Sequence, residues 1–166
     1  MLYETALVIA ERAKSVLGPH CERFEIAGSI RRRRQFCHDI DVVVVPGNQG
    51  AFLAALQFLG KMKSGGEKMM QVQMNGAVLD VYIATPETWA TLLLIKTGSA
   101  AHNRMLCGKA LSKGMKLHAD GTGLFRPSSV AFGSPAVYLR VAGDTEDSIF
   151  NALGMPYIPP ERREVL

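Results

Sequence analysis

The sequence predicts an α/β protein with a mixed sheet and flanking helices, followed by a smaller α+β lobe. Three observations predict this fold. Apolar residues repeat at helical spacing over 3–17. A nearly continuous apolar segment over 40–45 is typical of a buried strand. Asn75-Gly76 separates two strand-like segments and is a strong hairpin signal. At 166 residues, the chain is long enough for one compact domain or for a core with a small appendage.

In the first half, helices and strands follow one another closely. The first helix, over 3–17, ends at Gly18-Pro19. A short strand with Phe24 and Ile26 follows, and then a short helix for which Ser29 is the expected N-cap. The remaining elements of this half are a strand over 40–45, a helix over 49–59, a loop at Ser64-Gly65-Gly66, and strands over 68–74 and 77–84.

From residue 86 the pattern changes. A helix is expected from Pro86 to about 96, and a second one from about 99 to 112, with Thr97-Gly98-Ser99 between them. After Gly114 the sequence predicts short strands at 115–118, 124–126 and 137–141 and a final helix over 145–153. We therefore expect two parts, 1–85 and 86–166.

Bulk composition indicates a folded globular protein, because 48% of the residues are hydrophobic and 20% are charged. The apolar runs are too short to span a bilayer, so no membrane contact is expected. The N-terminus has no basic segment ahead of an apolar one and does not resemble a signal peptide. Three cysteines without paired spacing (Cys21, Cys37 and Cys107) indicate reduced thiols and a cytoplasmic location.

Positive charge is concentrated in residues 96–126. Six basic residues face only Asp120 there, a net charge of +5, so the rest of the chain carries −1 of the total of +4. A local basic stretch suits a polyanion such as nucleic acid. A solvated helix face explains the same charges equally well.

The strongest chemical signal is Gly28-Ser29 followed by Asp39-Ile40-Asp41. Acids at positions i and i+2 of a strand point to one face, and such a pair beside an apolar core is costly unless something offsets the charge. Asp80 lies in another apolar strand. If strands 39–45 and 77–84 are neighbours, the three carboxylates form a hard-oxygen site suited to Mg²⁺ or Mn²⁺. Two such ions, about 3.5–4 Å apart, could share one bridging aspartate.

The other interpretation is that these acids cap strand ends or pair with surface arginines. The spacing, together with the distant strand aspartate, favours the metal site. Gly28 permits close backbone approach, and Ser29 can donate a hydrogen bond to phosphate. Of the four arginines at 31–34, we expect one or two to contact phosphate and the others to face solvent.

These residues resemble the palm signature of family X DNA polymerases, within the wider nucleotidyltransferase superfamily. The resemblance runs in order from about residue 23 to 164. Its further segments are Leu79-Asp80-Val81, Thr97-Gly98-Ser99-Ala100-Ala101-His102-Asn103, Gly114-Met115-Lys116-Leu117, Gly123-Leu124-Phe125-Arg126, and Thr145-Glu146-Asp147 through Pro156-Tyr157-Ile158-Pro159-Pro160-Glu161. The Thr-Gly-Ser segment and the Pro-Tyr-Ile-Pro-Pro ending are its most specific parts.

The resemblance implies a nucleotidyltransferase palm over 1–85 and a helical connection with a thumb-like lobe over 86–166. It implies that Asp39 and Asp41 bind two divalent ions, and that Asp80 binds the catalytic ion and helps to activate the primer 3′-hydroxyl. The implied nucleotide-binding residues are Gly28, Ser29, Arg32, His38, Gly98, Ser99 and Asn103. Among these, Ser29 and Arg32 would hold the β- and γ-phosphates, and Asn103 would face the incoming base. The Gly98-Ser99 peptide is often cis in this family. Expected DNA contacts are Arg104, near the template base, and Lys109, Lys113 and Lys116.

Two departures from the family pattern matter. An aromatic pair that normally precedes Thr-Gly-Ser and excludes the ribose 2′-hydroxyl is replaced by Ile95 and Lys96. We therefore expect weak discrimination against ribonucleotides. A basic residue that contacts the primer in some members is replaced by Val78.

The sequence matches only the polymerase core, like the reduced viral members of the family. We expect no lyase activity, weak or gap-dependent DNA binding and low processivity. Our interpretation is a monomeric, template-directed DNA polymerase that fills short gaps in DNA repair, using dNTPs and tolerating rNTPs on primer-template or gapped DNA. It would act in the cytoplasm, or inside the host cell if viral. The alternatives are a template-independent nucleotidyltransferase acting on RNA, protein or a small molecule, and a catalytically silent nucleic-acid-binding module.

Overall fold

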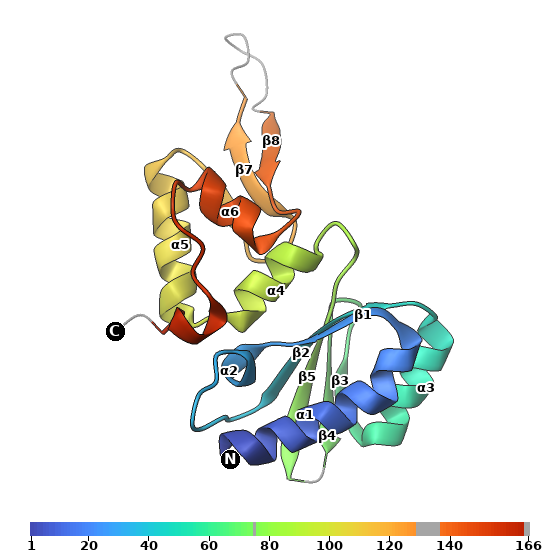
Figure 1. The fold of residues 1–166 in the computed structure, drawn as a ribbon. Coiled ribbons are helices and arrows are strands. Elements are labelled where there is room, and N and C mark those ends of the chain that lie inside the picture. Colours follow the sequence, from blue (N-terminus) through green and yellow to red (C-terminus); the bar gives the residue numbers. More distant parts are fainter. Residues whose placement is uncertain (75, 129–136, 165–166) are drawn as a thin grey trace.

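The computed structural model describes residues 1–74, 76–128 and 137–164 and has two sheets, with helices packed against each (Figure 1). The larger sheet has five strands in the order β1-β2-β5-β4-β3. Their bounds are β1 (Cys21–Ile26), β2 (Ile40–Pro46), β3 (Lys61–Gly65), β4 (Met69–Met74) and β5 (Ala77–Ile83). Because β2 and β5 are parallel and the other pairs are antiparallel, the sheet is mixed, as predicted.

Helices α1 (Tyr3–Leu17) and α3 (Gln49–Leu59) cover one face of this sheet (Figure 1). The apolar stripe of α1 is buried as predicted, with Ala6, Ala10 and Ala13 fully inaccessible. Asn48 caps α3, because its side chain accepts a hydrogen bond from the amide of Ala51. This face contains the main hydrophobic core of the first half of the chain.

The opposite face of β2 packs against α4 (Trp89–Thr97). Val43 and Val45 point to this side and contact Leu92 and Leu93 of the helix. Since alternate residues of a strand share a face, Asp41 lies on the same side as Val43 and Val45. Its carboxylate therefore faces the space between the sheet and the second half of the chain.

The second half has a core of its own around Leu94, Leu106 and Phe150. Its elements are α5 (Ala100–Ser112), β6 (Lys116–His118), β7 (Gly123–Pro127), β8 (Tyr138–Ala142) and α6 (Glu146–Ala152), with β6-β7-β8 forming an antiparallel sheet. Thr145 caps α6 through a capping box with Ser148. Along the chain, the first sheet ends before residue 85 and the second begins after it. The division into two domains remains a prediction. Three short helices complete the fold: η1 (Gly18–His20), α2 (Gly28–Arg31) and η2 (Pro160–Arg162).

Three local predictions differ from the structure. Residues 61–65 form edge strand β3, where a loop was expected over 64–66, because this mostly exposed strand lacks an apolar alternation. Helix α4 begins at Trp89 rather than at Pro86, after a turn. Ser29 is not an N-cap, because α2 begins at Gly28 and Ala27 is its N-cap residue. The predicted hairpin joins β4 and β5, although Asn75 itself lies outside the described residues.

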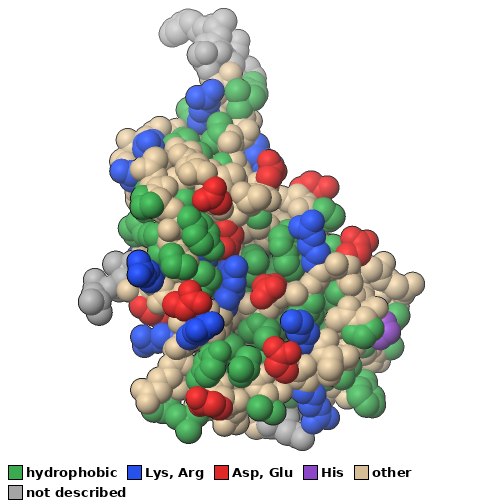
Figure 2. All heavy atoms as spheres, viewed as in Figure 1, with side chains coloured by type: hydrophobic (Ala, Val, Ile, Leu, Met, Phe, Trp, Pro, Cys, Tyr) green, Lys and Arg blue, Asp and Glu red, His purple; other side chains and the backbone are tan. Residues whose placement is uncertain are grey.

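Among the described helices, none combines the length and the apolar character needed to cross a membrane. The three cysteines are free thiols, as expected, and Cys37 is buried. On the face drawn in Figure 2, basic and acidic side chains are interspersed where the upper and lower parts of the molecule meet. This face therefore shows no large patch of one charge.

Candidate active site

Two of the three predicted metal ligands lie directly beside each other in the sheet. Strands β2 and β5 are parallel neighbours, and Asp41 is the register partner of Asp80. Asp39 precedes β2 by one residue and is half-buried, whereas Asp80 is only 8% exposed. The predicted adjacency of the two strands is therefore observed. It results from pairing between segments almost forty residues apart in the sequence.

The electrostatic cost of this arrangement falls on Asp41. Burial, followed by the negative charges of Asp39 and Asp80, raises the pKa of Asp41 to about 7. A hydrogen bond from the Tyr82 hydroxyl and the charge of Arg32 act in the opposite direction, but they do not offset the increase. Burial and the carboxylate of Asp41 likewise raise the pKa of Tyr82. A cation beside Asp41 would offset the electrostatic cost of keeping this carboxylate ionised.

The three carboxylates fit a divalent cation in their chemistry. All are hard oxygen donors, and their mutual repulsion is what a bound Mg²⁺ or Mn²⁺ would offset. As they stand, no group of three Asp, Glu, His or Cys side chains in the described part of the chain is close enough to hold a metal ion. One oxygen of Asp80 instead accepts a hydrogen bond of 2.9 Å from Gln71. The acids are thus neighbours without forming a closed ligand set.

A cavity of about 340 Å³ lies against Asp39 and Asp41. It is lined by every residue that the family resemblance implied to bind nucleotide: Gly28, Ser29, Arg32, His38, Gly98, Ser99 and Asn103. These residues come from the turn at α2, from the loop before β2 and from the junction of α4 and α5. Asp80 lies beside Asp41 but does not line the cavity. The fold therefore gathers residues from two distant segments around one space.

Gly28 is required where Asp41 approaches the α2 turn. Its φ of +56° is in the left-handed region, and a Cβ atom there would lie 1.9 Å from Oδ2 of Asp41. The neighbouring Ser29 hydroxyl is buried and has no hydrogen-bond partner among the described residues. A buried hydroxyl without a partner is costly. Because Ser29 lines the cavity, a ligand oxygen is a suitable partner for it.

The four consecutive arginines separate into different environments. Arg31 turns toward α6, and Arg33 and Arg34 are exposed. Arg32 lies at the cavity, where it donates a hydrogen bond to the carbonyl of Thr97. Its Nε atom lies 2.5 Å from the Glu164 carboxylate. The residue expected to bind phosphate is therefore paired with a carboxylate of the same chain.

The junction of α4 and α5 forms the opposite wall of the cavity. The Gly98-Ser99 peptide is cis, in agreement with the resemblance. Ser99 caps α5 by accepting a hydrogen bond of 3.3 Å from the amide of His102. Asn103 donates to the carbonyl of Ile95, while its buried Oδ1 atom has no partner among the described residues. This leaves an amide oxygen at the cavity that can accept a hydrogen bond.

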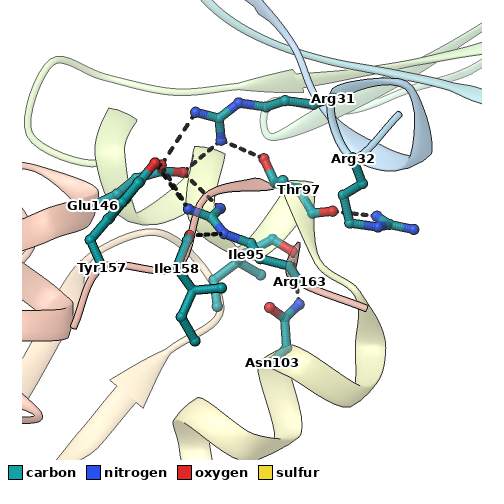
Figure 3. A network of polar contacts seen from close by, with 9 residues as sticks. All are labelled: Arg31, Arg32, Ile95, Thr97, Asn103, Glu146, Tyr157, Ile158 and Arg163. Carbon is teal, nitrogen blue, oxygen red and sulfur yellow. Dashed lines mark hydrogen bonds and ion pairs between the residues drawn. The ribbon is translucent and has the colours of Figure 1, made fainter. Parts of the chain in front are cut away.

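An ion-pair network connects α2 with α6 and the C-terminal segment (Figure 3). Glu146 accepts two hydrogen bonds from Arg31 (2.7 and 3.2 Å) and two from Arg163 (3.2 and 3.0 Å). Arg31 also donates to the Thr97 hydroxyl, and Arg163 is completely buried. Burial acts to raise the pKa of Glu146, but hydrogen bonds from Arg163 and Arg31 outweigh it, so the net shift is downward. Sequence analysis did not identify this network.

The predicted DNA-contacting residues all lie at the surface of the second half. Arg104 and Lys109 belong to α5, and Lys113 and Lys116 follow it. All four side chains are exposed, and within the described residues none forms an ion pair. This placement is compatible with a nucleic-acid contact and equally with solvation.

Comparison with known proteins gives a consistent result. A family described as DNA polymerase beta thumb matches residues 92–164. The chain is 29% identical over 162 residues to DNA polymerase lambda of Rattus norvegicus, covering 82% of this chain and 28% of the relative. It is 26% identical over 151 residues to DNA polymerase/3'-5' exonuclease PolX of Bacillus subtilis (strain 168), covering 87% of this chain and 25% of that relative. The chain thus spans about a quarter of the length of these curated relatives.

Two solved structures share the fold, both of Leishmania infantum polymerase beta. The ternary P/T complex superimposes with a TM-score of 0.73 at 22% identity and covers 99% of this chain and 77% of that one. The ternary gap complex superimposes with a TM-score of 0.74 at 21% identity and covers 99% of this chain and 71% of that one. The predicted fold class is therefore confirmed.

The Glu146 network predicts a strong effect on stability. Glu146→Ala leaves two largely buried guanidinium groups without their shared anion, so we expect a loss of about 3–5 kcal/mol in the free energy of unfolding. Urea denaturation measures it. The matched control is Glu161→Ala, which removes a carboxylate from the exposed pair with Arg33 and should cost at most about 1 kcal/mol. Equal losses in the two variants would contradict the network's role.

The contact between Glu164 and Arg32 predicts competition with anions. An anion that binds the Arg32 guanidinium competes with Glu164 for it, so Glu164→Gln should tighten the binding of inorganic triphosphate by up to about fivefold, the equivalent of one accessible ion pair. Calorimetric titration at low ionic strength measures this. Glu161→Gln changes the net charge equally but acts at exposed Arg33. The competition is refuted if this control tightens binding as much as Glu164→Gln does.

Proposed function

We propose that this chain is a DNA polymerase of the family X type and catalyses template-directed addition of nucleotides to a primer 3′-hydroxyl in short DNA gaps. One observation carries the proposal. All seven residues expected to bind nucleotide line a single cavity against Asp39 and Asp41, with Asp80 paired to Asp41 in the next strand. Relatives named as DNA polymerases support it.

In this proposal, each side of the cavity has a different task. The free hydroxyl of Ser29 and the guanidinium of Arg32 hold the β- and γ-phosphates, with Glu164 displaced. The wall formed by Gly98, Ser99 and Asn103 receives the sugar and base, and the free Oδ1 of Asn103 offers an acceptor. The α-phosphorus then lies toward Asp39 and Asp41. Catalysis rests mainly on positioning and electrostatics.

Asp39 and Asp41 would hold two divalent cations, Mg²⁺ or in its place Mn²⁺, and Asp80 would contribute to the catalytic one. Such ions, when bound, neutralise phosphate charge and lower the pKa of the attacking hydroxyl. Asp41 is suited to this role because its carboxyl is already destabilised in the charged form by burial and by Asp39 and Asp80. The primer hydroxyl approaches from the side of Asp80.

The DNA would lie across the second half of the chain. Arg104, Lys109, Lys113 and Lys116 are exposed cations without ion-pair partners in the described structure, so they are free to contact phosphate. Because this basic stretch is short, we expect weak, salt-sensitive binding and low processivity. The ternary gap complex of a protein with the same fold supports gapped DNA as the substrate.

Extension of a primer across a one-nucleotide gap tests the proposal. The protein should add the complementary dNTP in the presence of Mg²⁺ or Mn²⁺, and Asp80→Asn should lower kcat by at least about 10²–10³ because it removes charge at the reacting centre. The control Asp147→Asn removes an exposed carboxylate on α6 and should change little. Omitting the template distinguishes a template-independent transferase. If the wild type binds DNA but shows no Mg²⁺-dependent extension, the protein is a silent binding module and the proposal is refuted.

The cavity wall beside the sugar predicts weak selection against ribonucleotides. Ile95 and Lys96 occupy the wall where the family has aromatic side chains, and the Lys96 ammonium lies 4.1 Å from the centre of the Tyr82 ring. Without a fixed aromatic obstacle, we expect kcat/KM for dNTP to exceed that for rNTP by less than about 10²-fold. Lys96→Phe should increase this preference, whereas Lys96→Met, which removes only the charge, should not. A strong preference for dNTP in the wild type would defeat the idea.

A further inference from the structure

We propose that Gln71 is a positioning residue that orients the Asp80 carboxylate, an inference that rests on the proposed polymerase function. Gln71 lies on β4 and is the register partner of Asp80 on β5. Its Nε2 atom donates a hydrogen bond of 2.9 Å to Oδ1 of Asp80. The contact is partly buried, since Asp80 is only 8% exposed and Gln71 is half-buried.

Strand pairing builds this contact into the sheet. Along β4, Met70, Val72 and Met74 are buried, and the residues between them, Gln71 and Gln73, are half-buried. Since alternate residues of a strand share a face, Gln71 and Gln73 point to the side opposite the main core. That side is the one on which the acids lie.

Cross-strand register then forms a polar row over four strands. Asp41 pairs with Asp80, Asp80 with Gln71, and Gln71 with Ser64. The Ser64 hydroxyl lies 3.4 Å from Oε1 of Gln71 and can donate to it. This interaction places the oxygen of the Gln71 amide toward β3 and its NH₂ group toward Asp80.

The chemistry of an amide suits this position. A neutral donor fixes one carboxylate oxygen without adding positive charge that would compete with a cation for Asp80. Among the described residues, no donor reaches the other oxygen, Oδ2, which leaves it free for the reaction. Gln71 does not line the cavity, so it does not contact the bound nucleotide directly.

This arrangement predicts that Gln71 affects turnover and not nucleotide binding. Partners that orient metal-binding carboxylates typically contribute 10- to 100-fold to activity or metal affinity. Gln71→Met keeps an unbranched side chain of similar size but cannot donate. We expect it to lower kcat for one-nucleotide gap filling by about 10–100-fold and to leave KM for the dNTP unchanged.

The matched control is Gln73→Met, on the same strand and the same face. The Gln73 amide donates only to the carbonyls of Met74 and Ala77 among the described residues and does not touch the acids. The Gln73→Met variant should therefore retain the wild-type kcat. Gln71→Ala provides a second variant, and thermal denaturation identifies which variants are folded. A folded Gln71 variant with wild-type kcat, or with its whole loss in KM, overturns the proposal.

A second measurement needs neither DNA nor catalysis. Tb³⁺ seeks oxygen ligands as Mg²⁺ does, and Tyr82 beside Asp41 can sensitise its luminescence. Titration of the metal-free protein should show weaker Tb³⁺ binding for Gln71→Met than for the wild type and Gln73→Met. If the wild type extends no primer, the polymerase proposal fails, while this titration still decides whether Gln71 orients Asp80. Unchanged Tb³⁺ affinity in Gln71→Met counts against that orientation.

Discussion

The carboxylate of Glu146, shared by Arg31 and Arg163, is the interaction on which the arrangement of the whole molecule depends. Arg31 ends α2, Glu146 begins α6, and Arg163 lies in the C-terminal segment (Figure 3). Each of these charges would be costly to bury alone, so they are stable only together. Because Arg31 also binds Thr97, next to the cis peptide, the network joins both walls of the cavity.

The acidic side of the cavity shows how a sheet concentrates charge. Parallel pairing of β2 with β5 forces Asp41 and Asp80 together, and the resulting penalty appears as the raised pKa of Asp41. Neutral groups lie beside the acids: Gln71 donates a hydrogen bond to Asp80, and the Tyr82 hydroxyl acts to lower the pKa of Asp41. Such partners fix the carboxylates and leave their charge for a cation. The C-terminal segment acts on the basic side, where Glu164 neutralises Arg32 beside the cavity.

Local patterns were enough to predict much of this fold, and the family resemblance supplied most members of the candidate site. The helical stripe of α1, the apolar strand β2 and the hairpin at Gly76 depend on neighbouring residues, so they can be recognised in the sequence. Edge strand β3 was missed because its exposed residues carry no apolar alternation. Ser29 was expected to cap a helix, but α2 begins one residue earlier, and its hydroxyl is left free at the cavity.

By itself, the sequence determined which residues are candidates for the chemistry: two aspartates at strand spacing, a third in another apolar strand, and a Gly-Ser turn beside arginines. Only the tertiary structure decided what these residues contact. It gave Asp80 a glutamine from β4, Arg32 a carboxylate from the C-terminal segment, and Arg31 a glutamate 115 positions away. The reason is physical: charge and hydrogen-bond partners follow from distance in space, which is set by strand register and core packing and not by separation along the chain.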